Sequence, residues 1–324
     1  MNHQSAAEVA AVAALLQIGA ELRIDHVLDS ADAFSVAELA GVANVPEGGA
    51  AEFVRALAAA GLVAETETAG RFRVSEDYAQ WKHAAGYLSW SLNANRPFIE
   101  HAREFLTDRE ATARLHQRDG RRVAVSSRWI GEPTFYPAVI DRVQAAGARR
   151  VADLGAGAAG LLIKLLQQEP QRTGLALDIS AAACAAAREA ADRAGVGDRL
   201  EVVERPIESL LEDSGVLEGA DAIVACFVMH DIVRDDTLSG GVLRTCRSAL
   251  APGGRLLVAD AVSYAQDERE RKFSALFTYL HANFMDVPLP SEKEWEDKFH
   301  AAGFSQVETV TEILPGARVF VAAK

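Results

Sequence analysis

The sequence has few cysteines, with only Cys184, Cys226 and Cys246 among 324 residues. Three thiols far apart among apolar neighbours are not a disulfide framework, so we expect free thiols in a reducing, cytoplasmic setting. The chain also lacks any run of about 18 apolar residues, the length that crosses a membrane. Its first ten residues show no basic segment leading into an apolar stretch, so no signal peptide and no membrane partner are expected.

Basic residues are in the minority, with 33 Lys and Arg against 46 Asp and Glu, a net charge of −13. Nucleic-acid-binding proteins depend on Lys and Arg contacts to phosphate, so this class of partner is disfavoured. The remaining composition, 49% apolar and 24% charged, is that of an ordinary globular protein. The length is sufficient for about two domains, each with a core that needs no disulfide or structural metal.

Residues 1–115 are rich in Ala, Leu and Glu at helical spacing, which predicts a helical domain with linker helices. Ser35 is followed three residues later by Glu38, the pattern of a capping box at a helix start. A second helix is predicted over Glu52–Ala60, ending at Gly61.

Two short β-like runs follow this helix, Leu62–Ala64 and Phe72–Val74. A helix, a turn, a second helix and a two-stranded wing form the winged-helix pattern, which often binds DNA. The helix that would enter the major groove carries Arg55 as its single basic residue, whereas reading bases takes several polar or basic side chains. We therefore favour a dimerisation role for this domain.

Residues 116–324 are predicted to form the second domain, in which short β-branched runs alternate with Ala-rich helices from Arg149 onward. Such alternation indicates a parallel sheet with helices on both faces. The tail adds two runs separated by Pro315-Gly316, which predicts an antiparallel hairpin. The expected fold is therefore α/β, a seven-stranded, mostly parallel, Rossmann-like sheet. Its strands are predicted at Arg150–Leu154, Thr173–Asp178, Leu200–Glu204, Ala222–Phe227, Arg255–Ala261, Val307–Ile313 and Arg318–Ala322.

A glycine-rich turn joins the first of these strands to a helix, in the segment Val151–Gly160. Glycines allow a ligand to approach the backbone, and a helix start presents unpaired N–H groups. This turn alone does not separate nicotinamide-nucleotide dehydrogenases from other binders. Asp153 stands two positions before the first glycine, and Asp178 ends the next strand, where it can accept from ribose hydroxyls.

An acid-x-Gly-x-Gly turn with an acid after the second strand resembles the first motif of class I S-adenosylmethionine (SAM) methyltransferases. The resemblance continues through Leu250–Leu256 and the final hairpin, and with the winged-helix segment nearly the whole chain is similar to the dimeric small-molecule methyltransferases. It implies SAM as cofactor, a homodimer, Asp153 near the methionine amino group and Asp178 on the ribose. The cofactor-binding residues implied are Asp153, Gly155, Gly157, Asp178, Ile179, Ile207 and Phe227, with Ile207 packing on the adenine.

His230-Asp231 follows the fourth strand, and in open α/β sheets ligands bind beyond the carboxyl ends of the strands. O-methyltransferases of this architecture have His-Asp-Trp here and use the histidine as base, whereas this chain has Ile232 in place of the tryptophan. His281 lies among Phe, Tyr and Leu side chains, where a histidine is often simply part of a core. Two histidines and a carboxylate are, however, also a typical ligand set for a catalytic metal.

His230-Asp231 with a later histidine resembles a narrower group, the SAM-dependent C-methyltransferases of 2-oxo acids. These methylate phenylpyruvate, indolepyruvate, 4-methyl-2-oxopentanoate or 5-guanidino-2-oxopentanoate at the β-carbon, for β-methyl amino acid biosynthesis. The resemblance implies a non-haem iron or zinc ion held by His230, His281 and Asp231, with Asp231 also placed to act as base. Chelation by such an ion stabilises an enolate.

The carboxylate of a 2-oxo acid calls for a guanidinium group, and Arg128 is the first candidate, although a surface ion pair explains it equally well. Two alternatives to this reading remain open. One is a metal-free O-methyltransferase of a phenol or enol in which His230 alone is the base. The other is a regulator without catalysis.

Overall fold

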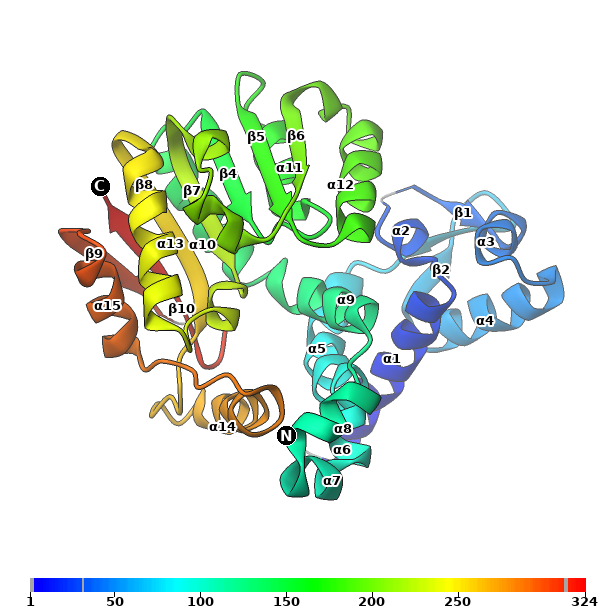
Figure 1. Ribbon diagram of the computed structural model, residues 1–324. Helices are drawn as coiled ribbons and strands as arrows, with labels where there is room; N and C mark the ends of the chain where they lie inside the picture. The colour runs from blue at the N-terminus through cyan, green and yellow to red at the C-terminus, as the bar shows by residue number, and fades with distance from the viewer. Residues whose placement is uncertain (1–2, 31, 312–313) are drawn as a thin grey trace. The chain divides into compact units, whose positions relative to one another are not determined.

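The computed structural model describes residues 3–30, 32–311 and 314–324 (Figure 1). The chain forms two compact units, one from the residues up to Ala102 with Arg114–Pro133, the other from Arg103–Ala113 with Thr134–Lys324. The expected boundary at residues 115 and 116 differs from this division.

Helix packing explains the difference. Helix α9 (Gly120–Gly131) lies against α5 (Tyr78–Leu88) so closely that a Cβ on Gly86 would stand 2.9 Å from Ile130 Cγ1. The segment Arg103–Ala113 belongs instead to the second unit, where the Phe105 ring meets that of Phe284 at 5.3 Å.

The first unit combines helices with a small antiparallel sheet in the order β1-β3-β2. Its strands are β1 (Phe34–Ser35), β2 (Val63–Glu65) and β3 (Arg71–Val74). Its helices are α1 (His3–Glu21), α2 (Asp25–Leu28), α3 (Val36–Ala43), α4 (Glu47–Ala59), α5, the π-helix η1 (Ser89–Ala94), α6 (Arg96–Glu100) and α9, and two further helices lie near the boundary, α7 (Ala102–Thr107) and α8 (Arg109–Leu115).

The capping box predicted at Ser35 is present. The Glu38 amide donates to Ser35 Oγ at 3.2 Å, and the Ser35 amide donates to Glu38 Oε2 at 2.7 Å. The helix predicted to begin at Glu52 begins at Glu47, because Pro46 provides the N-cap and the two glycines that follow adopt helical backbone angles. The two wing strands are present, and the unpredicted β1 adds a third.

The second unit contains a seven-stranded sheet in the order β6-β5-β4-β7-β8-β10-β9, with helices on both faces (Figure 1). The pairs among the first five are parallel, and β10 is antiparallel to both its neighbours, which confirms the expected fold class. The strands are β4 (Arg150–Leu154), β5 (Thr173–Asp178), β6 (Leu200–Glu204), β7 (Ala220–Cys226), β8 (Leu250–Ala261), β9 (Gln306–Val310) and β10 (Ala317–Ala323). The end of the strand predicted at Val307–Ile313 includes Glu312 and Ile313, which lie outside the described residues.

The helices of the second unit pack their apolar faces against the sheet, as α13 shows. Val242, Leu243 and Cys246 of α13 are buried in one core cluster with Leu154 and Ile223 of the strands. The helices are α10 (Phe135–Ala145), α11 (Gly160–Gln168), α12 (Ala181–Arg193), α13 (Asp236–Ala249), α14 (Arg271–Leu280) and α15 (Glu292–Ala301), with the 3₁₀ turns η2 (Gly197–Arg199), η3 (Ile207–Leu211), η4 (Gly215–Leu217) and η5 (Met229–Asp231) and the π-helix η6 (His281–Met285).

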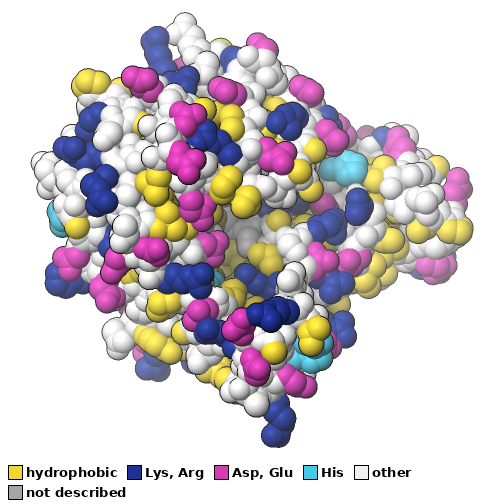
Figure 2. Space-filling model, viewed as in Figure 1, with side chains coloured by type: hydrophobic (Ala, Val, Ile, Leu, Met, Phe, Trp, Pro, Cys, Tyr) yellow, Lys and Arg dark blue, Asp and Glu magenta, His cyan; other side chains and the backbone are white. Residues whose placement is uncertain are grey.

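Charged side chains of both signs are mixed on the face of the molecule drawn in Figure 2. On the face drawn in Figure 2, acidic and basic side chains are interspersed, and the basic ones do not gather into a patch. Across the part of the chain that the structure describes, no helix combines the length and the apolar character needed to cross a bilayer.

Candidate active site

The glycine-rich turn between β4 and α11 has the tight backbone that the sequence predicts. Gly155 and Gly157 have φ angles of +70° and +55°, the region that favours glycine. A Cβ on Gly155 would lie 2.7 Å from Val228 Cγ2, so that position has no room for a side chain. The Gly155 amide donates to the Leu177 carbonyl at 2.7 Å, which ties the turn to the end of β5.

Asp178 is held beside this turn at the end of β5. Its Oδ2 accepts from the Gly157 amide at 2.8 Å, and its Oδ1 accepts from the Ser180 amide, also at 2.8 Å. A carboxylate oxygen has a second lone pair, so both can still accept from a ribose hydroxyl. The ribose contact itself stays a prediction.

Asp153 is a buried carboxyl group on β4. Burial, with a further contribution from the negative charge of Asp178, raises the pKa of Asp153 to about 8. A cation placed beside such a group would favour its ionised form. The pair of acids and the two glycines therefore fit a ligand with a positive amino group and ribose hydroxyls, as SAM has.

The other predicted cofactor residues lie around the same sheet edge. Ile179 follows Asp178 and its side chain is 70% exposed, whereas Ile207 is buried in the core cluster below the sheet edge. Phe227 follows β7 with a φ angle of +54°, and its amide donates to the Ala259 carbonyl at 2.7 Å. Their contacts with a cofactor stay predictions.

His230 lies in the turn η5, just beyond the carboxyl end of β7, and is paired with Asp260 at the end of β8. Its Nδ1 is 2.7 Å from Asp260 Oδ1, and its backbone amide donates to Asp260 Oδ2 at 3.0 Å. The Ala261 amide also donates to Oδ1. Because Asp260 receives two backbone donors, it acts as an acceptor, and Nδ1 of His230 carries the hydrogen. The basic nitrogen of His230 is then Nε2.

Sequence reasoning missed Asp260, although it is fully buried and sets the orientation of His230. The available signal was an acid in the otherwise apolar strand segment Leu256–Ala261. Burying a carboxylate is costly unless it is paired, so an acid in a buried strand indicates a hydrogen-bond partner. Here the partner is His230, at the end of the neighbouring strand.

His281 begins the π-helix η6, which continues α14. Its Nδ1 is 2.8 Å from the Phe277 carbonyl, and its ring is stacked on that of Phe277 at 4.0 Å. The rings of His230 and His281 are 5.0 Å apart and nearly perpendicular. The structure thus brings together the two histidines that the sequence singled out.

The third predicted metal ligand, Asp231, lies beside His230. Asp231 Oδ1 is 3.6 Å from His230 Nε2, and its side chain is 65% exposed. Within residues 3–30, 32–311 and 314–324, no group of three or more His, Cys, Asp or Glu side chains is arranged to hold a metal ion. The set of His230, His281 and Asp231 is therefore not supported as a three-ligand metal site.

Arg128 lies on α9 in the first unit, where its Nη1 is 3.1 Å from Asp29 Oδ2. An ion pair of this kind is what we expect of an arginine that stabilises the fold. Its predicted contact with a substrate carboxylate stays a prediction.

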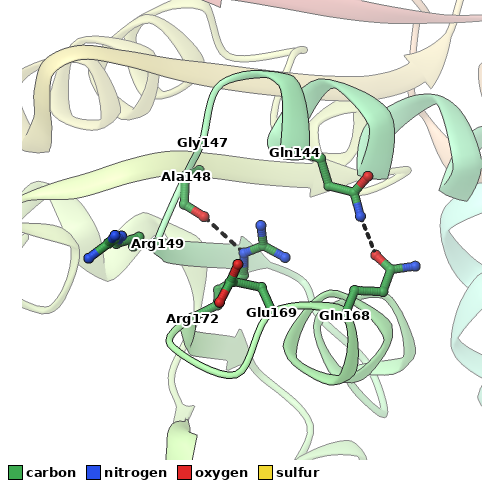
Figure 3. A pocket seen from close by; sticks show the side chains of 7 residues that line it. All are labelled: Gln144, Gly147, Ala148, Arg149, Gln168, Glu169 and Arg172. Carbon is green, nitrogen blue, oxygen red and sulfur yellow. Dashed lines mark hydrogen bonds between the residues drawn. The ribbon is translucent and has the colours of Figure 1, made fainter.

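A cavity of about 330 Å³ lies at the opposite end of the sheet, where the chain enters β4 (Figure 3). Arg172 spans it and donates from Nε to the Ala148 carbonyl at 2.9 Å, while Gln144 donates to Gln168 at 2.7 Å. The lining includes none of the predicted site residues. This cavity is therefore separate from the glycine-rich turn and the histidines.

The comparisons with known proteins agree with this geometry. Residues 152–256 match a family model described as a methyltransferase domain. An O-methyltransferase family protein from Burkholderia thailandensis superimposes with a TM-score of 0.59 at 21% identity, over 96% of this chain and 94% of that one. The fold is that of the class I SAM-dependent methyltransferases.

Curated relatives are similar over part of their length. Aclacinomycin 10-hydroxylase RdmB of Streptomyces purpurascens is 32% identical over 54% of this chain and 44% of its own. A 3-hydroxy-5-methyl-1-naphthoate 3-O-methyltransferase of Streptomyces sahachiroi is 29% identical over 60% and 56%, and indolepyruvate C-methyltransferase of Streptomyces griseus is 27% identical over 61% and 59%. The chain spans about half the length of the curated relatives it matches.

Proposed function

We propose that this chain transfers the methyl group of SAM to a hydroxyl oxygen of a small aromatic or enolic molecule of secondary metabolism, with His230 as general base. The observation that carries the proposal is the His230–Asp260 pair, 2.7 Å apart at the carboxyl ends of two neighbouring strands. O-methyltransferases also predominate among the curated relatives.

The cofactor would be held at the glycine-rich turn, with Asp153 facing its amino group and Asp178 its ribose. When bound, SAM supplies a methyl group activated by the sulfonium. The chain's own contribution at this end is a turn held in place by hydrogen bonds, since the Gly155 amide donates to the Leu177 carbonyl and the Gly157 amide to Asp178. Preorganisation of this kind avoids a cost at the moment of binding.

His230 would accept the proton of the acceptor hydroxyl at Nε2, which makes the oxygen a stronger nucleophile. The resulting imidazolium is stabilised by Asp260, and a hydrogen bond to a charged group contributes about 1.5–3 kcal/mol. General-base catalysis of this type typically accelerates a reaction about 10²–10⁴-fold. Asp260 also fixes which ring nitrogen carries the hydrogen in the resting enzyme.

Aromatic side chains beside the histidine suit a planar acceptor. The Phe227 ring lies 5.0 Å from that of Phe135 and 6.2 Å from that of Phe277, which in turn contacts both histidines. Offset and edge-to-face contacts with such rings favour aromatic ligands.

A second candidate function is C-methylation of a 2-oxo acid, favoured by the position of His281 beside His230 and by the indolepyruvate C-methyltransferase among the relatives. In that reaction His230 would take a proton from the β-carbon, and Arg128 would bind the carboxylate. The predicted iron or zinc ion belongs to this candidate, and among the described residues no group of three His, Cys, Asp or Glu side chains is arranged to hold it.

The test is product analysis with SAM carrying a deuterated methyl group, a panel of phenols and naphthols, and a panel of 2-oxo acids. We expect a labelled methyl on oxygen. A label on carbon, or activity that EDTA abolishes and iron or zinc restores, would favour the second candidate. A product that contains an added oxygen atom and no deuterated methyl group would make the chain a hydroxylase. One relative, aclacinomycin 10-hydroxylase RdmB, is named as such an enzyme.

Two variants test the base. We expect His230→Asn to lower kcat by about 10²–10⁴-fold. His300→Asn is the control, because Nδ1 of His300 also has an acceptor, the Phe304 carbonyl at 3.0 Å, but His300 lies on the exposed side of α15. Equal activity of the two variants would refute a role for His230.

A further inference from the structure

We infer that Asp286 is a positioning residue of the acceptor site, and that its ion pairs with Arg109 and Arg234 set the affinity for the acceptor. Through these pairs the residues Arg103–Ala113, which we call the strap, hold the turns that carry the two histidines in their binding arrangement. This inference rests on the proposed function and assigns a control of that same site.

The strap packs against the π-helix η6, which carries His281. The Phe105 ring of the strap is 2% exposed and meets the Phe284 ring of η6 edge-on, with 5.3 Å between the ring centroids. Tyr279 of α14 contacts the same Phe284 ring at 5.6 Å. Phe284 is three residues from His281, so a displacement of the strap would also displace the part of η6 that carries the histidine.

Asp286 directly follows η6 and joins three segments of the second unit. Its Oδ1 is 2.6 Å from Nη1 of Arg109, the first residue of α8 in the strap. Its Oδ2 is 3.3 Å from Nη1 of Arg234, which follows the turn η5 that contains His230. One carboxylate therefore links the strap to the turns that carry both histidines.

Local structure favours neither Arg109 nor Asp286 at its position. Arg109 begins α8, and the dipole of a helix disfavours a positive charge at this end. Asp286 has a φ angle of +61°, a left-handed conformation that few residues other than glycine adopt. Each residue gains its favourable interaction from the other, so the bridge between segments accounts for both.

The bridge acts on acceptor binding rather than on the chemical step. When it is lost and the strap and η6 can move away from η5, only a fraction of the molecules keeps the histidines in this arrangement. The apparent affinity for the acceptor falls by that fraction. The 2.7 Å contact between His230 and Asp260 involves neither Arg109 nor Asp286, so the base still acts on an acceptor that has bound. Loss of the bridge should therefore raise KM and leave kcat unchanged.

The experiment measures kcat and KM for the acceptor, with SAM saturating, in R109Q, D286N and the double variant. The probe is the phenol or naphthol of the panel with the highest kcat/KM, or 2-naphthol if none is methylated. Asn adopts the left-handed conformation as Asp does, so D286N removes the charge and retains the shape.

An exposed ion pair changes an equilibrium by about 1.4–5-fold. We expect KM to rise about threefold in R109Q and about fivefold in D286N, which loses two pairs. The values of kcat and of the Kd for SAM should stay at those of the wild type. The double variant should have the KM of D286N, because the pair that R109Q removes is already absent there.

Arg103→Gln is the matched control. Arg103 is an exposed arginine of the same strap, and its side chain makes no ion pair with any residue that the structure describes. Salt gives a second control, because the screening length falls from about 10 Å at 0.1 M to about 3 Å at 1 M. The ratio of the KM of D286N to that of the wild type should fall towards one at 1 M NaCl, whereas a folding defect would persist.

The outcomes separate the inference from the function. Methyl transfer with equal KM in the wild type, R109Q and D286N overturns the inference and leaves the proposed function standing. A parallel loss of kcat, SAM affinity and thermal stability would make the bridge merely structural and also overturn the inference.

If no phenol or naphthol is methylated, the proposed function is refuted, and the Kd of 2-naphthol takes the place of KM. It is measured by titration calorimetry on the full chain with S-adenosylhomocysteine present. Weaker binding in R109Q and D286N but not in R103Q then supports the inference without the function. Equal binding in all variants, or none in the wild type, overturns both.

Discussion

Replacing Asp153 with Asn should stabilise the chain without SAM while weakening its affinity for SAM. Burial and the nearby charge of Asp178 raise the pKa of Asp153 from its ordinary 3.8 to about 8. Between these values the folded chain holds a proton that the unfolded chain has released. The folded state binds more protons, so this group makes the protein less stable as pH rises, by about 1.4 kcal/mol per pH unit.

The free energy of unfolding of D153N, which has no such proton, should therefore rise relative to that of the wild type. Between pH 5 and pH 7 the difference should grow by about 3 kcal/mol, measured by urea melts without SAM. Asp297→Asn, which removes an exposed carboxylate from α15, is the control and should show no such slope. Parallel pH profiles for D153N and the wild type would contradict a raised pKa at Asp153.

SAM binding gives the second measurement. If the cofactor amino group requires the ionised form of Asp153, binding below pH 8 releases one proton. The Kd of the wild type should then fall about tenfold per pH unit between pH 5.5 and pH 7, where the amino group of SAM itself stays protonated. Calorimetry in two buffers of different ionisation enthalpy counts the proton. D153N should bind more weakly and independently of pH, and a flat wild-type profile would refute the assignment.

Three further outcomes are expected. Gly155→Ala should lower the free energy of unfolding by about 2–4 kcal/mol and abolish SAM binding, because the new Cβ meets Val228 and the φ angle is positive. Gly157→Ala, where the Cβ would meet open space, should lower the free energy of unfolding by about 1 kcal/mol. Equal losses in urea melts would contradict the clash at Gly155. Asp260→Asn should lower kcat by about 10³-fold or more while leaving SAM affinity unchanged, because the amide no longer fixes the tautomer of His230; an unchanged kcat in steady-state assays would refute the pairing. Trp295→Phe should lose about 1–3 kcal/mol in thermal melts, because a buried strand carbonyl loses its indole donor, and no change in Tm would show that water replaces that donor.

Three strands of the second unit were fully predictable because each is a short, mainly apolar run that ends before a turn or a helix. β4, β5 and β6 begin and end where the pattern does. β8 begins at Leu250 rather than Arg255, because Leu250 still pairs with Ala220 of β7, and the register shifts across the Pro-Gly-Gly turn before Arg255 pairs with Ala222. Such a continuation depends on the partner strand, which local sequence does not reveal.

In the candidate site, too, the sequence predicted single residues but not the contacts between distant segments. Asp178 ends β5 and His230 lies in the turn after β7, so position along the chain was enough to find them. Asp260 is thirty residues from His230, and their pairing depends on β7 and β8 being neighbours. The closeness of His281 was expected, but the metal ion expected with it is not supported, because no three His, Cys, Asp or Glu side chains of the described residues are grouped to hold one.

The segment Arg103–Ala113 belongs to the second compact unit although both its neighbours in sequence belong to the first. The polypeptide therefore passes from one unit to the other three times, and no single cut separates them. During synthesis the first unit lacks α9 until residue 131 has left the ribosome. A fragment ending near residue 115 would expose the side of α5 that packs against α9, and a fragment extended to residue 133 would expose Phe105. Dissecting this protein by truncation should thus yield aggregation-prone pieces at either end point.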